Sequence, residues 1–375
     1  MRIAILTQPL RYNYGGILQN YALQTVLRRM GHDVVTLDPH RYHYKWWQYP
    51  ILILRHTITR YIRGYREVPI FAEWFRDKEI RVLGTNTFRF INQNICRKEY
   101  WDLTKDIKEQ DYDAFIVGSD QVWRPEYNRN LTNMFLDFTK DWTVRRIAYA
   151  ASFGTDTWSA DEDTTRKCCE GIRNFDMVTV REESGINLCH HLFNVLAQQV
   201  LDPTLLLDAD DYRKLFQQYD TFPYELPGKL YTYILDETSE NQQLISNYAN
   251  QTGMRFYTYN SKISDWKHPH TLEEQIQPPV ELWLKGFEQA SYIITDSFHA
   301  CVFSIIFKKQ FAVYGNPERG MSRYKSFFKL LGLQERFVRN YFDIKALPII
   351  DYNKVNAEIR KLRTQSLNLL TAFLS

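Results

Sequence analysis

The chain alternates short apolar runs with stretches of helical periodicity, and this alternation limits its fold more than any other feature. Residues 3–7 form an apolar run, and after a polar loop apolar residues such as Leu18 and Leu23 recur at helical spacing up to Gly31. Residues 34–37 form the next run and close a β-α-β unit. Strands joined by helices of this length form parallel sheets with right-handed crossovers. The sequence therefore predicts an α/β fold.

The same alternation returns in the second half of the chain, which predicts two Rossmann-like domains. Further strands are expected at residues 114–117, 147–150, 177–180, 231–235, 256–259, 292–295 and 311–314. We expect a first domain at residues 1–210, a second at 211–352, and a C-terminal helix at 353–375 that straps the two together. Ligands of such sheets bind beyond the carboxyl ends of the strands, so the loops that follow strands are the expected site.

Residues 40–110 interrupt the alternation and predict a basic, aromatic helical insert in the first domain. Residues 40–81 hold nine lysines and arginines against four acids, interleaved with aromatic residues such as Trp46 and Trp47. Such a segment suits an anionic membrane surface, or it is a solvated helix that covers the edge of the sheet. Because no apolar run is long enough to span a bilayer and no signal peptide is visible, we expect a cytoplasmic protein. Its peripheral contact with the inner face of the membrane would use residues 40–81.

Charge and cysteine content argue against several classes of function. The 47 lysines and arginines nearly balance 44 acids, which does not favour a nucleic-acid partner. Five cysteines without a CxxC pair predict neither a disulfide framework nor a metal site. No cluster of potential metal ligands is visible either, so no metal is expected.

Two loops of the first domain carry residues suited to ligand binding. The first strand is followed by Asn13, Tyr14, Gly15 and Gly16, where glycines allow close approach to the backbone and a helix begins. The strand at 114–117 is followed by Asp120 and Gln121. Asp120 suits a base or a ligand of sugar hydroxyls, and it equally suits a helix N-cap. Neither loop has the dinucleotide-binding or Walker pattern.

Later strand ends carry charged residues. Arg181 follows the strand at 177–180 at the start of a helix, where a cation is unfavourable unless an anion lies nearby. The anion expected near Arg181 is either a bound ligand or the side chain of Glu182 or Glu183. His299 follows the strand at 292–295 and enters a helix, a position that suits a general acid. Arg319 and Arg323 follow the last strand and add two guanidinium groups at the same sheet end.

These loops together resemble the polysaccharide pyruvyl transferase family. The matching blocks, in the order of the family, are residues 13–15 with 18–23, 117–123, 148–154, 180–184, 201–206 and 296–299. The resemblance implies a GT-B-like fold with a cleft between an acceptor-side first domain and a donor-side second domain. It also implies transfer of pyruvate from phosphoenolpyruvate, as co-substrate and without a cofactor, to a sugar. That sugar belongs to a cell-surface polysaccharide, such as a capsule or exopolysaccharide, or to its lipid-linked precursor, and the product is a cyclic ketal.

The resemblance also assigns roles to individual residues. The general-acid histidine of the family falls on His299 and one donor-binding arginine falls on Arg181. Other members carry an arginine two residues before the histidine, where this chain has Ser297, which brings no charge to a phosphate. We therefore expect a donor side made of Arg181, Ser297, Phe298, Arg319 and Arg323, and an acceptor side made of Asn13, Tyr14, Gly15, Gly16, Asp120 and Gln121.

Two other functions remain open at this point. A GT-B glycosyltransferase that uses a nucleotide sugar would share the fold and the cleft, because a fold alone does not fix function. A non-catalytic saccharide-binding relative would have lost its donor site through Ser297.

Overall fold

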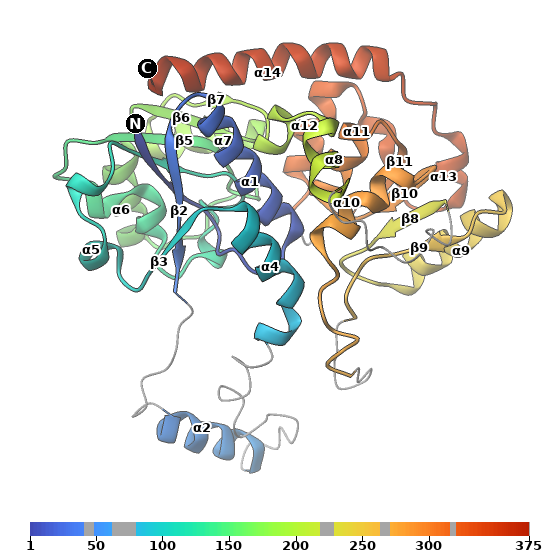
Figure 1. Ribbon diagram of the computed structural model, residues 1–375, viewed down its shortest axis with the longest axis horizontal. Coiled ribbons are helices and arrows are strands. Elements are labelled where there is room, and N and C mark those ends of the chain that lie inside the picture. Colours follow the sequence, from blue (N-terminus) through green and yellow to red (C-terminus); the bar gives the residue numbers. More distant parts are fainter. Residues whose placement is uncertain (41–48, 62–79, 218–228, 263–270, 316–319, 375) are drawn as a thin grey trace.

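The computed structural model describes residues 1–40, 49–61, 80–217, 229–262, 271–315 and 320–374. The described residues form two parallel β-sheets, each flanked by helices, and the two α/β units lie side by side (Figure 1). The predicted fold class, with two Rossmann-like domains, is therefore confirmed.

The first sheet has seven strands in the order β3-β2-β1-β4-β5-β6-β7. Its strands are β1 (Arg2–Leu6), β2 (Asp33–Pro39), β3 (Arg97–Tyr100), β4 (Ala114–Val117), β5 (Arg145–Ala151), β6 (Met177–Val180) and β7 (Gln198–Gln199). Every neighbouring pair is parallel. The central strands are buried on both faces, which explains why they are almost continuously apolar.

Helices cover both faces of this sheet. One face is covered by α1 (Tyr14–Arg29) and α4 (Thr85–Asn94), and the other by α5 (Leu103–Asp106), α6 (Glu162–Ile172) and α7 (Glu183–Phe193). Asn13 caps α1, because its side chain accepts a hydrogen bond from the backbone nitrogen of Gly16. The capped end places Asn13 and the first turn of α1 beside the carboxyl end of β1.

The expected helical insert over residues 40–110 is only partly correct. Residues 97–100 form β3, an edge strand parallel to β2, and α4 packs against α1. The strand was missed because three of its four residues are charged; Arg97 forms an ion pair of 2.8 Å with Asp38 of β2. Within residues 40–81 the structure describes mainly one helix, α2 (Tyr49–Tyr61). Residues 41–48 and 62–79 lie outside the described residues.

The second sheet has five parallel strands in the order β12-β11-β10-β8-β9. Its strands are β8 (Leu230–Tyr233), β9 (Phe256–Tyr257), β10 (Tyr292–Thr295), β11 (Gln310–Tyr314) and β12 (Phe337–Val338). The helices of this unit are α8 (Ala209–Gln217), α9 (Ser239–Thr252), α10 (Val280–Gln289), α11 (Phe298–Ile306), α12 (Ser322–Leu331) and α13 (Tyr341–Ala346). Helices α10, α11 and α12 share one apolar core with α1, so the two domains are packed directly against each other.

The last helix, α14 (Tyr352–Leu374), lies across both domains (Figure 1). At its start, the hydroxyl of Tyr352 donates to the carbonyl of Ser304 in α11, at 3.4 Å. Near its end, the guanidinium of Arg145 in β5 donates to the carbonyl of Phe373, at 2.7 Å. The second domain and the amino end of the first sheet are therefore joined by one helix.

Candidate functional site

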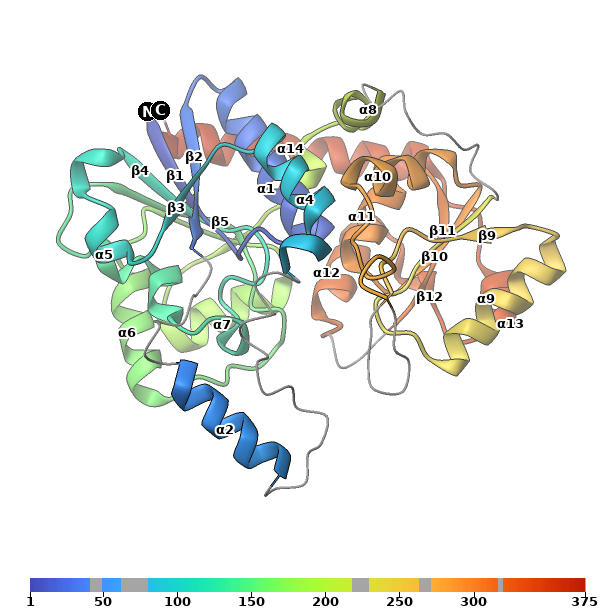
Figure 2. The ribbon, with the colours of Figure 1, turned by 60° about the horizontal axis from the view of Figure 1, so that its bottom comes forward.

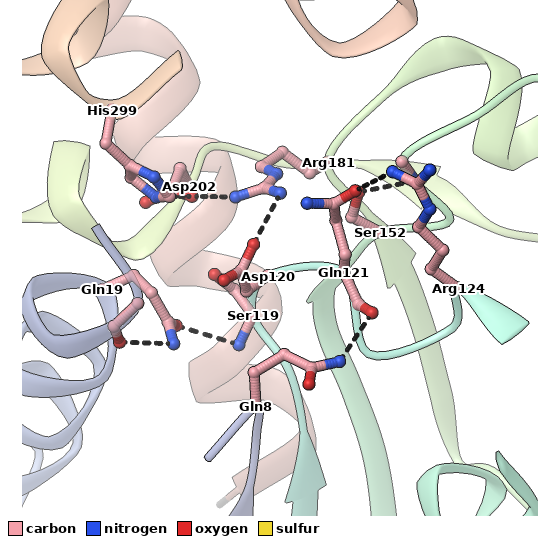
Figure 3. A network of polar contacts seen from close by, with 12 residues as sticks. Gln8, Gln19, Ser119, Asp120, Gln121, Arg124, Ser152, Arg181, Asp202 and His299 are labelled. Carbon is pink, nitrogen blue, oxygen red and sulfur yellow. Dashed lines mark hydrogen bonds and ion pairs between the residues drawn. The ribbon is translucent and has the colours of Figure 1, made fainter. Parts of the chain in front are cut away.

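A cluster of buried polar side chains lies where the strand ends of the two domains meet (Figure 3). Asp120 follows β4 and Arg181 follows β6, whereas His299 comes from the first turn of α11 in the second domain. Asp202 caps a short 3₁₀ helix, η6 (Pro203–Leu206), between the domains. All four side chains are buried, so in this structure the surfaces expected to face each other across a cleft are in contact.

Arg181 lies between two carboxylates. Its Nη1 is 2.7 Å from Oδ2 of Asp202, and its Nη2 is 3.3 Å from Oδ1 of Asp120. Burial alone lowers the pKa of Arg181, but the carboxylates of Asp202 and Asp120 outweigh it and raise that pKa. The anions that the sequence required near this arginine are therefore two aspartates from other loops.

The neighbouring glutamates have other partners. Oε1 of Glu182 accepts hydrogen bonds from the hydroxyl of Ser152 and from the backbone nitrogens of Phe153 and Gly154, at 2.8–3.2 Å. Glu183 forms an exposed ion pair of 2.8 Å with Lys329 of α12. In the described residues, neither Glu182 nor Glu183 forms a hydrogen-bonded ion pair with Arg181, although the charge of Glu182 also raises the pKa of Arg181.

Asp202 connects the arginine to the histidine. Its Oδ1 accepts from the backbone nitrogen and the hydroxyl of Thr204, at 3.0 and 2.7 Å, and its Oδ2 lies 3.6 Å from Nε2 of His299. Burial would raise the pKa of Asp202, but His299 and Arg181 outweigh it and hold that pKa well below its usual range. Sequence reasoning missed this residue as a site residue, although the Asp-Pro-Thr pattern of an N-cap was visible.

His299 packs against the first turn of α1. A Cβ atom built on Gly15 would lie 2.0 Å from Nδ1 of His299, so only glycine leaves room for the imidazole. The same turn brings Gly16 close to Asp120, whose Oδ2 would lie 3.5 Å from a Cβ at that position. Gly15 therefore lets the second domain approach the α1 backbone, whereas a Cβ at Gly16 would make only an ordinary van der Waals contact with Asp120.

Phe298 lies beside two guanidinium groups. The ring centroid of Phe298 is 4.9 Å from Cζ of Arg181 and 5.6 Å from Cζ of Arg323, which is within the range of cation–π contact. Arg323 is buried in the first turn of α12, where burial and the nearby Arg181 lower its pKa. Arg323 therefore belongs to the cluster, while Arg319 lies outside the described residues.

The remaining predicted residues have mainly structural contacts. Ser297, in the N-cap position of α11, is buried and makes no side-chain capping bond. Tyr14 donates its hydroxyl to the carbonyl of Pro278 in the second domain, at 2.6 Å. Gln121 accepts from Arg124 at 2.9 Å. Of the predicted acceptor residues, the structure brings Gly15, Gly16 and Asp120 to the cluster; Asn13 serves as an exposed helix cap.

A buried hydrogen-bond network supports the Asp120 loop. The amide of Gln19 donates to the hydroxyl of Thr7 and to the carbonyl of Gly16, at 3.0 and 2.9 Å. Its oxygen accepts from the backbone nitrogen of Ser119, at 3.1 Å, as Figure 3 shows. Since Ser119 precedes Asp120, this network fixes the loop relative to β1 and α1.

The fold places the protein in a broad structural class. It is similar to UGT89C1 of Arabidopsis thaliana, solved with UDP-L-rhamnose, with a TM-score of 0.53 and 9% identity over 99% of this chain and 98% of that one. UGT2 of Phytolacca americana gives a TM-score of 0.48 at 10% identity, covering 99% of this chain and 98% of that one. The architecture is GT-B-like, and at such low identity the similarity speaks for the fold alone.

The sequence defines the family within this class. A profile of the polysaccharide pyruvyl transferase family matches residues 13–318, and the chain belongs to that family. The protein is accordingly a transferase. A search of curated proteins found no match. None of the helices in the described residues has the length and apolar character needed to cross a bilayer.

Proposed function

We propose that the protein transfers pyruvate from phosphoenolpyruvate to two hydroxyls of one sugar and so forms a cyclic ketal. The acceptor is a cell-surface polysaccharide or its lipid-linked precursor. The observation that carries this proposal is the position of His299 beside Arg181 and Arg323, in one buried cluster between the domains. A proton donor and two guanidinium groups are what an enol phosphate donor requires.

The chemistry follows from these side chains. His299 gives a proton to the methylene carbon of phosphoenolpyruvate, which makes C2 electrophilic. One sugar hydroxyl adds to C2 and gives its proton to Asp120, a carboxylate of the predicted acceptor side. The second hydroxyl then forms the other C2–O bond as the C2–O bond to phosphate breaks, and its proton returns to His299. Pyruvate ends as a ketal, and inorganic phosphate leaves.

The arginines would bind the charged groups of the donor. Guanidinium groups bind phosphate and carboxylate through paired hydrogen bonds and stabilise the charge of the leaving group. Arg323 supplies the cation that Ser297 does not supply, because its guanidinium lies beside the residue that follows Ser297. Since the cluster is buried, the donor would enter when the two domains separate.

The direct test is incubation with phosphoenolpyruvate and a panel of free and lipid-linked saccharides, followed by mass spectrometry for a pyruvate adduct. His299→Ala should abolish turnover and leave donor binding within a few fold, because the proton matters most in the transition state. His191→Ala, an exposed histidine at the end of α7, is the matched control. Near wild-type activity of His299→Ala would remove His299 from the mechanism.

Two alternatives have different signatures. If UDP or GDP raises the melting temperature and phosphoenolpyruvate does not, the nucleotide-sugar glycosyltransferase function is favoured; at present only the GT-B-like fold supports it. If saccharides bind but no donor gives turnover, the protein is a non-catalytic saccharide-binding relative.

A further inference from the structure

Helix α2 carries an apolar stripe that faces solvent. Ile51 and Leu54 are each 61% exposed, Ile58 is 37% exposed and Tyr61 is 69% exposed. Their spacing of three and four residues places them on one side of the helix, and no residue of α2 is buried. Four of the ten large hydrophobic side chains that are exposed in the described residues lie on these 13 residues. Such concentration marks a binding surface.

The charges of α2 indicate the partner. The helix contains Arg55, His56 and Arg60 and no acidic residue. Arg55 is exposed and directly follows Leu54 of the stripe. A helix with an apolar side and only basic charged residues fits the surface of an anionic lipid bilayer, where acyl chains take the apolar side and headgroups take the cations.

The segment that carries α2 leaves and re-enters the fold near the candidate site. It starts at the carboxyl end of β2, the edge of the first sheet where Asp120 and Arg181 lie. It returns at Ile80, whose carbonyl accepts from the hydroxyl of Tyr12, at 3.1 Å, just before the first turn of α1. In both Figure 1 and Figure 2, α2 stands apart from the two sheets, and in Figure 1 it lies on the side where β2 ends.

We propose that α2 docks on an anionic membrane surface and turns the strand-end side of the protein toward it. With 13 residues, and about 1.5 Å of rise per residue, the helix is too short to span a bilayer and would lie in the interface. A second consequence, which rests on the proposed function, is that the acceptor is a lipid-linked saccharide presented at that surface.

The test is co-sedimentation of the full chain with vesicles of phosphatidylcholine, alone or with about one-third phosphatidylglycerol. We expect binding to the anionic vesicles that weakens with added salt. A triple variant, Ile51→Ser, Leu54→Ser and Ile58→Ser, should lose about tenfold or more of this binding. Arg55→Glu should also weaken it. A double variant, Leu196→Ser and Ile349→Ser, is the matched control, because these residues are 87% and 86% exposed outside α2.

Because α2 buries none of its residues, the triple variant should keep the wild-type melting temperature. Vesicle binding equal to that of the wild type would overturn the proposal. A second result would also overturn it: the wild type forms a dimer, the triple variant does not, and neither protein binds vesicles. The apolar stripe would then bind a second copy of the chain.

Activity assays separate the two parts of the proposal. The triple variant should turn over a water-soluble saccharide at the wild-type rate and a vesicle-embedded acceptor more slowly. If the triple variant matched the wild-type rate on the vesicle-embedded acceptor as well, the proposal that the acceptor is lipid-linked would be overturned. A wild type that binds vesicles and pyruvylates no saccharide would contradict the proposed function and leave the docking of α2 in place.

Discussion

Gly15 of α1 and His299 of α11 are in direct contact across the two domains, and a Cβ at position 15 would lie 2.0 Å from Nδ1 of His299. Alanine is about 1 kcal/mol better than glycine inside a helix, so the helix itself would tolerate Gly15→Ala. The imidazole would have to move. We expect Gly15→Ala to lower kcat by one to two orders of magnitude, because a displacement of the general acid by about 1 Å has an effect of this size.

The control for Gly15→Ala is Gly253→Ala. Gly253 has a φ of +66° and nothing within 4 Å of a Cβ, so alanine there strains only the backbone. It should lower the melting temperature without changing kcat. Wild-type kcat in Gly15→Ala would show that His299 can act from another position.

Asp202→Asn should destabilise the protein in a pH-dependent way. The pKa of Asp202 is depressed in the folded state by His299 and Arg181, so its ionisation stabilises the fold above the ordinary aspartate pKa. We expect a loss of about 3–5 kcal/mol at neutral pH, because Arg181 loses one of the two ion pairs that the described residues give it. The difference from wild type should shrink as pH falls below about 4.

Urea unfolding of Asp202→Asn at several pH values measures this difference. Asp163→Asn on the surface of α6 is the control, since its ion pair with Lys167 is exposed and screened by solvent. A loss for Asp202→Asn that does not change with pH would show that packing, not charge, accounts for it.

Tyr14→Phe should affect stability more than saccharide binding. The variant removes a partly buried hydrogen bond to the carbonyl of Pro278, which is worth about 1 kcal/mol. The acceptor KM should stay at the wild-type value, because the Tyr14 ring is packed against Trp283, with centroids 5.2 Å apart. Thermal unfolding and acceptor kinetics measure both effects, with exposed Tyr127→Phe as the control. A raised acceptor KM with unchanged stability would return Tyr14 to the acceptor site.

Arg323→Ala should weaken the binding of phosphoenolpyruvate. Loss of one charge-assisted contact costs about 1.5–3 kcal/mol, or roughly ten- to a hundredfold in Kd. Lys329→Ala removes a cation from the exposed side of the same helix and should leave Kd unchanged. Calorimetric titration of both variants makes the comparison. Equal Kd values would assign the donor charge to other residues.

The sequence predicted the parts of the fold that depend on local pattern. Buried parallel strands such as β1 and β4 are apolar over nearly their whole length, so their runs were visible. The edge strand β3 was not visible in the sequence, because three of its four residues are charged. The two-residue strands β7 and β12 are defined only by pairing with their neighbours.

The sequence predicted those site residues that follow a strand in the chain. Arg181 and His299 follow strands, and parallel strand ends meet at one edge. Asp202 follows a two-residue strand by three positions, and its contact with His299 depends on how the domains pack. The same holds for Tyr14, whose partner Pro278 lies in the other domain.

The position of α14 determines how the molecule can open. The chain crosses between the domains near η6 and crosses back as α14, and the two crossings are bonded together: Arg363 donates to the carbonyls of Leu205 and Leu207, at 2.7 and 3.0 Å. Two adjoining connections would let the domains rotate about one axis and would resist rotation about others. Because α14 ends at the amino end of β5 and the cluster lies at the opposite strand ends, rotation about that axis would part His299 from Gly15 first.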